Sequence, residues 1–129
     1  MLTAASLASI LLMTFHLTDD VVRGFEPGGL KNEIGVLILA VWLYGTLAIA
    51  GRAARYVVIL LGSVLGSGVP VVHMMGPGLV GGRVAGSDGT FFWVWTLLAL
   101  GVTALFSVAL AVRALVGLWR GGSAQDQPS

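Results

Sequence analysis

Four long apolar stretches divide the chain, and short polar segments separate them. The stretches cover approximately residues 2–20, 33–51, 55–73 and 90–119, and within each of them the apolar residues are continuous, without alternation. The hydrocarbon core of a bilayer is about 30 Å thick, which a helix of about 20 apolar residues crosses. Because helices satisfy all their own backbone hydrogen bonds in lipid, the pattern predicts four transmembrane helices.

The polar segments predict the connections between these helices. Residues 51–55, Gly-Arg-Ala-Ala-Arg, predict a tight turn, and the glycine-rich residues 74–90 predict a longer irregular loop. Residues 121–129 predict a disordered polar tail. We therefore expect residues 1–120 to form a single all-α domain, an integral membrane four-helix bundle.

Composition agrees with a membrane protein. The chain of 129 residues is 57% hydrophobic and 10% charged, whereas soluble domains are about 25% charged. A net charge of +1 without a basic run gives no reason to expect nucleic acid as a partner. Cysteine is absent, which excludes disulfides and thiolate metal ligands. The first apolar stretch lacks the preceding basic residues and the cleavage site of a signal peptide, so we expect it to be retained.

The arginines and the lysine favour one orientation of the four predicted helices. Loops on the cytoplasmic side of a membrane are enriched in Lys and Arg. One side of the predicted bundle carries Arg52, Arg55, Arg113 and Arg120, and the other side carries Arg23, Lys31 and Arg83. This difference predicts that both termini face the cytoplasm, in a multi-pass protein of a bacterial-type plasma membrane with the lipid bilayer as its partner.

A polar cluster lies at the end of the first apolar stretch. His16, Asp19, Asp20 and Arg23 are spaced at i, i+3, i+4 and i+7, so a helix places them on one face. Charged residues at such a position are expected to face the bundle interior or a water-filled cleft. The first and third helices run in the same direction, so His73, near the end of the third, is expected close to the same membrane surface.

Three interpretations of this polar cluster remain open. In the structural one, an aspartate pairs with Arg23, His16 forms a hydrogen bond and His73 caps its helix. In the second, His16, Asp19 or Asp20, and His73 bind a transition metal such as iron, zinc, copper or manganese. In the third, the two histidines hold a non-covalent haem. Arg23 is also a candidate for a gate or a salt bridge, together with Glu26.

Small residues mark one face of the third predicted helix. Gly62 and Gly66 are spaced as GxxxG, and Ser63 and Ser67 repeat the spacing. Such residues allow helix backbones to approach closely. We expect them to pack against another helix of the same chain, with a homodimer interface as the alternative.

No catalytic motif is persuasive in this chain, so the preferred function is non-enzymatic. We expect a small accessory module that packs with itself or with a membrane protein partner. The first alternative is a metal- or haem-binding membrane protein, for electron transfer or metal-dependent catalysis, that uses His16, Asp19 or Asp20, and His73. The second alternative is a carrier of small molecules or ions with the same cluster as its gate.

Overall fold

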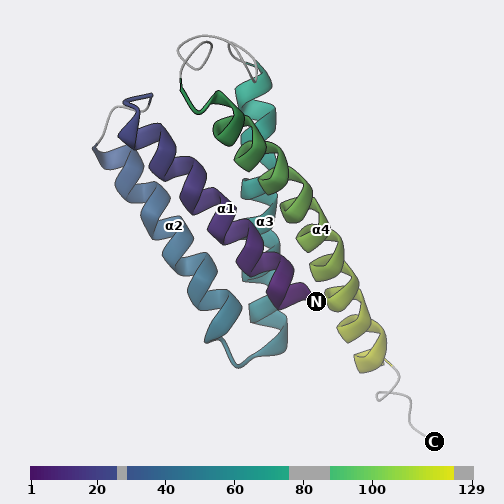
Figure 1. The fold of residues 1–129 in the computed structure, drawn as a ribbon. Helices are drawn as coiled ribbons and strands as arrows, with labels where there is room; N and C mark the ends of the chain where they lie inside the picture. The colour runs from purple at the N-terminus through teal and green to yellow at the C-terminus, as the bar shows by residue number, and fades with distance from the viewer. Residues whose placement is uncertain (26–28, 76–87, 124–129) are drawn as a thin grey trace, which may run out of the picture.

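The computed structural model describes residues 1–25, 29–75 and 88–123, and these contain four helices and no strand. The helices are α1 (Leu2–Val22), α2 (Leu30–Leu47), α3 (Arg52–Met75) and α4 (Thr90–Ser123). They alternate in direction, so that α1 and α3 point one way and α2 and α4 the other (Figure 1). The predicted all-α fold is confirmed.

Three of the helices are long and apolar enough to cross a membrane. These are α1, α3 and the part of α4 from Thr90 to Gly121. The apolar part of α2, Glu33–Leu47, is shorter. At 1.5 Å per residue its 15 residues span about 22 Å, less than the hydrocarbon thickness of about 30 Å.

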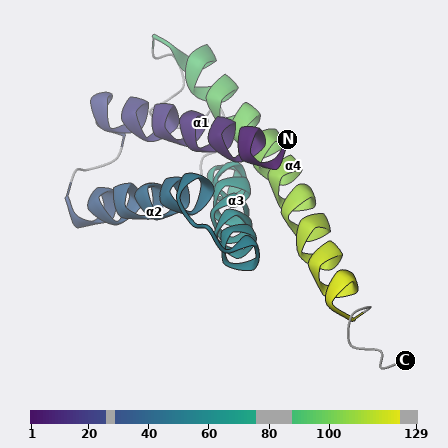
Figure 2. The ribbon, with the colours of Figure 1, turned by 90° about the horizontal axis from the view of Figure 1, so that it is seen from below.

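α1 and α3 form the centre of the bundle, and α2 and α4 lie on its outside. Both α1 and α3 contact α4 on one side and α2 on the other, whereas α2 and α4 do not touch each other within the described ranges. When the molecule is viewed from below, α4 slopes away from the remaining helices toward its C-terminal end (Figure 2). The end of the bundle that contains the start of α4 is therefore where α1, α3 and α4 come together.

The buried face of α4 follows a regular spacing. Six of its buried residues recur at alternating intervals of four and three, as in a coiled-coil seam: Trp93, Leu97, Leu100, Ala104, Ser107 and Ala111. Thr96 and Gly101 are also buried. The small members of the seam let α3 approach, and Ser63 donates a hydrogen bond of 2.9 Å to Ser107. A Cβ atom added at Gly101 would lie 3.0 Å from the ring of Pro70. The seam thus brings α4 directly against α3.

Trp42 joins α2 to the rest of the bundle. Its indole lies on Gly62, where an added Cβ would be 2.4 Å from the ring, and on Gly66. Its Nε1–H donates to Ser6 Oγ at 2.9 Å, and Ser6 is also 2.8 Å from Thr46. Three helices meet at this one buried side chain.

Most of the small residues predicted to mediate packing of α3 therefore contact other helices of the same chain. Gly62 and Gly66 receive Trp42 from α2, and Ser63 bonds to α4. Ser67 differs, because its hydroxyl donates to the carbonyl of Val64 in its own helix. This arrangement agrees with close packing inside one chain.

The helix ends differ from the predicted ones by a few residues. α2 ends at Leu47, and residues 52–55 open α3 instead of forming a turn. Arginine and alanine are strong helix formers, so this segment favours the helix. α4 includes residues 121–123, which the sequence placed in the tail, although glycine at 121 and 122 is a poor helix former. The remaining tail, residues 124–129, lies outside the described residues.

Gly62→Ala is expected to lower stability, because the new methyl group would displace the Trp42 ring. Overpacking of this kind costs about 1–3 kcal/mol. Gly68→Ala is the matched control, since a Cβ there meets nothing within 4 Å. Unfolding of the two variants and the parent chain in detergent, followed by circular dichroism, measures the difference. Equal stability of the two variants would show that Trp42 does not depend on Gly62.

Candidate functional site

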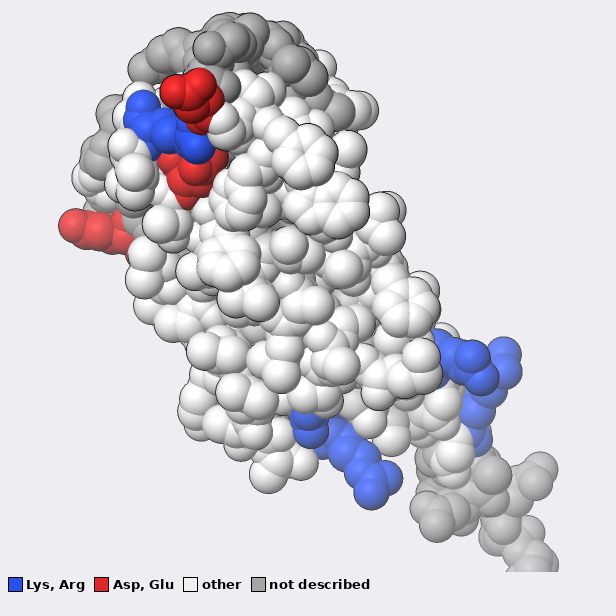
Figure 3. Space-filling view, viewed as in Figure 1, with Lys and Arg blue, Asp and Glu red and all other residues white. Residues whose placement is uncertain are grey.

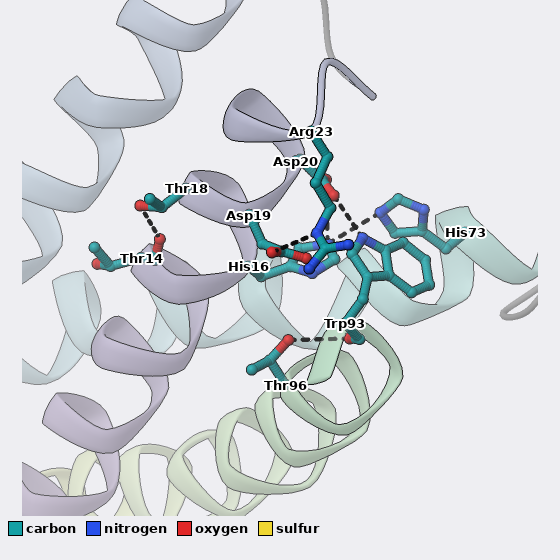
Figure 4. Close-up of polar contacts among 9 residues, drawn as sticks. All are labelled: Thr14, His16, Thr18, Asp19, Asp20, Arg23, His73, Trp93 and Thr96. Atoms are coloured by element: carbon teal, nitrogen blue, oxygen red, sulfur yellow. Dashed lines mark hydrogen bonds and ion pairs between the residues drawn. The ribbon is translucent and has the colours of Figure 1, made fainter. Parts of the chain in front are cut away.

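Three helices contribute side chains to a polar cluster at one end of the bundle. His16 and Asp20 come from the last two turns of α1, His73 from the end of α3, and Trp93 from the first turn of α4. Their side chains point toward one another, with His16 and Trp93 between α1 and α4 (Figure 4). The two histidines, which were expected near the same end of the bundle, are in direct contact.

Three potential metal ligands converge in this cluster. The Nε2 atoms of His16 and His73 are 3.2 Å apart. His16 Nε2 is also 3.5 Å from Asp20 Oδ2. One ligand atom from each of the three residues lies within 4.8 Å of the others. The positions i and i+4 on α1 place His16 and Asp20 one turn apart on the same face, which explains why both can face His73.

Two of the three potential ligands are removed from solvent. His16 is 1% exposed and Asp20 is 4% exposed, while His73 is half-buried. Burial of a carboxylate without a compensating charge or hydrogen bond carries a large cost in free energy. With both imidazoles neutral and Asp20 ionised, the three side chains carry a net charge of −1, which a bound cation would compensate.

Trp93 completes the cluster and was not recognised from the sequence. Its Nε1–H donates a hydrogen bond to Asp20 Oδ1. Its ring centroid lies 5.2 Å from that of His16 and 5.0 Å from that of His73. The aromatic run at residues 91–95 suggests an interfacial belt, and Phe91 and Trp95 are indeed exposed. The sequence feature that could have predicted its burial is the four-and-three spacing that Trp93 shares with Leu97 and the later residues of the seam.

The neighbouring acid, Asp19, has a different partner. Its Oδ1 accepts a hydrogen bond of 2.7 Å from Arg23 Nε. Arg23 also donates to the backbone carbonyl of Asp88, in the turn before α4. This chain of contacts, which we call the Arg23 latch, ties the end of α1 to the start of α4. Of the two candidate aspartates, the structure brings only Asp20 to the histidines, and Glu26 lies outside the described residues.

Charge is divided between the two ends of the molecule. On the face shown in Figure 3, acidic side chains and one basic group gather at one end, and basic groups alone stand at the other. The acids of the first end include Asp19 and Asp88, both in contact with Arg23 through side chain or backbone. The second end contains Arg113 and Arg120 of α4. The cluster thus lies at the acidic end.

The geometry disfavours a haem between the two histidines. A porphyrin held by both would have to lie between the imidazole rings, with the iron bonded to each. The rings instead meet edge to face at 90°, and their Nε2 atoms are in hydrogen-bond contact. Trp93 packs against both rings. A single ion fits among these three donors far better than a macrocycle.

Comparisons of the chain with known protein families, curated proteins and solved structures find no match. The function must therefore be argued from the site itself.

Gly89→Ala is expected to loosen the Arg23 latch. Gly89 has a φ of +88°, and an added Cβ would collide with the Arg23 guanidinium. Gly24→Ala is the control, because Gly24 has a φ of +67° but space for a Cβ. Backbone strain alone costs about 1–2 kcal/mol, so Gly89→Ala should be the less stable variant in chemical unfolding. If the two variants lose equal stability, the contact with Arg23 contributes nothing.

Proposed function

We propose that this protein is a small membrane protein that binds one divalent transition-metal ion through His16, Asp20 and His73. The observation that carries the proposal is the convergence of these three side chains, from two helices, to within 4.8 Å. A histidine pair with one carboxylate is a common ligand set for such ions.

The spacing of the donors supports a metal site. In a tetrahedral zinc site with bonds of about 2.0–2.1 Å, neighbouring ligand atoms are about 3.3 Å apart. The two separations measured from His16 Nε2 are 3.2 Å and 3.5 Å. These two separations match the spacing of ligands around zinc, and the three donor atoms all lie within 4.8 Å of one another.

Charge balance gives independent support. A divalent ion converts the net charge of −1 into +1, and it would replace the hydrogen bond between the two Nε2 atoms by a bond to each nitrogen. Arg23 supplies no such compensation to Asp20, because its side chain is engaged by Asp19 and the Asp88 carbonyl. Nitrogen and oxygen donors without sulfur suit zinc, iron, manganese and copper(II).

We further propose that all four helices cross a bacterial-type plasma membrane, with both termini in the cytoplasm. The alternating helix directions and the basic groups at the cytoplasmic end support this topology. The full length of α2 is 18 residues, about 27 Å at 1.5 Å per residue, close to the hydrocarbon thickness. The metal site then lies at the outer end of the bundle, and the protein is a metal-binding module rather than an enzyme.

The purified parent protein is expected to contain one transition-metal ion per chain. His73→Ala and Asp20→Asn should each lose at least about tenfold in metal affinity, because each removes a ligand. Asp19→Asn is the matched control, since Asp19 is adjacent in sequence but bonded to Arg23. Elemental analysis after gentle purification, followed by zinc titration with a competing chelator, measures both quantities.

Absence of metal from the parent protein, with no zinc binding on titration, would contradict the proposal. The cluster would then be a hydrogen-bonded contact between helices, and the protein a packing module for a partner. An equal loss of metal affinity in Asp19→Asn and Asp20→Asn would show that the ion is attracted by the negative charge at this end of the bundle and not bound at a defined site.

The topology is tested by reporter fusions along the chain. Reporters inserted at Gly28 and at Gly81 are expected outside the cell, and reporters at Ile49 and at the C-terminus are expected inside, since each helix reverses the side. A reporter whose activity depends on the compartment distinguishes the two sides. Identical signals at Gly28 and Ile49 would show that α2 does not cross.

A further inference from the structure

We infer that the hydrogen bond from Trp93 restricts Asp20 to binding the metal through one oxygen. The metal then keeps an open coordination position, which a small exchangeable anion can fill. This inference rests on the proposed metal site and adds the class of ligand that it takes.

The two oxygens of Asp20 have different partners. Oδ1 accepts a hydrogen bond from Trp93 Nε1–H, whereas Oδ2 faces His16 Nε2. Groups hydrogen-bonded to a metal-bound carboxylate fix its orientation. Because Trp93 is 3% exposed and occupies a fixed place in the buried seam of α4, it holds Oδ1 away from the ion. Asp20 then contributes one bond.

Three protein donors leave a transition metal incompletely coordinated. Structural zinc sites contain four protein ligands, whereas sites that bind an exogenous ligand contain three. Within the described ranges, no further His, Asp or Glu joins His16, Asp20 and His73. The apolar side chains that pack together with Trp93 supply no donor atom: Phe25, Val69, Val94 and Leu97.

The remaining position is accessible from one side. His16 and Asp20 are almost completely buried, but His73 is half-buried. Exchange of a ligand therefore takes place on the His73 side of the ion. The net charge of +1 that results from a divalent ion, two imidazoles and one carboxylate favours an anion over a neutral ligand. A small anion replaces a coordinated water by donating a lone pair, with no change of oxidation state.

Cobalt(II) and azide provide the test. Cobalt(II) replaces the native ion and has visible absorption bands that change with coordination number and with the identity of the ligands. In the parent protein, azide should shift these bands saturably, with one azide per cobalt. Trp93→Phe keeps an aromatic ring, smaller than the indole, but loses the N–H, so Oδ1 is free to bind the metal and azide affinity should fall at least about tenfold.

Trp95→Phe is the matched control, because Trp95 is two residues away on α4 and 60% exposed. It should retain the azide response of the parent protein. If the parent binds cobalt but azide changes nothing, the inference is overturned, and Glu26→Gln then asks whether Glu26 fills the fourth position. The inference is also overturned if Trp93→Phe and Trp95→Phe respond alike. Failure of the parent protein to bind cobalt at all would instead refute the proposed metal site.

Discussion

The buried carboxylate of Asp20 is the constraint on which the end of the bundle depends. A carboxylate that is 4% exposed must receive hydrogen bonds and a compensating charge, or the helix that carries it would be driven out of the bundle. Trp93 of α4 supplies one hydrogen bond, and His16 lies beside the second oxygen. His73 of α3 then meets His16. One polar group on α1 thereby specifies how two other helices must be placed.

Small side chains elsewhere make this placement possible. In lipid, helices associate through close packing rather than through the hydrophobic effect, so the backbones must approach one another. Gly62 admits the indole of Trp42 between α2 and α3, and Ser63 meets Ser107 between α3 and α4. These contacts lie toward the middle of the helices and set the angle and depth at which the helix ends meet. The site is thus supported by packing at some distance from its ligands.

Adjacent aspartates on α1 have separate roles because a helix turns by 100° per residue. Asp20 points between α1, α3 and α4, whereas Asp19 points to the side where Arg23 reaches the turn before α4. The Arg23 latch therefore restrains the turn before α4 at Asp88, five residues before Trp93, without taking part in the cluster. Because Asp19 is paired with Arg23, Asp20 is the one of these two acids that faces the histidines.

The sequence alone determined the all-α fold, the directions of the helices and the end at which His16 and His73 lie. These properties follow from the length of apolar runs and from helical periodicity, which are local. It also indicated small residues in α3 as packing residues. It did not show which of Asp19 and Asp20 faces the histidines. It also did not identify Trp93, because the four aromatic residues among residues 91–95 cannot be told apart until the packing of α4 is known. Those choices belong to the tertiary structure, since the rotation of each helix about its own axis is decided only when three helices pack together.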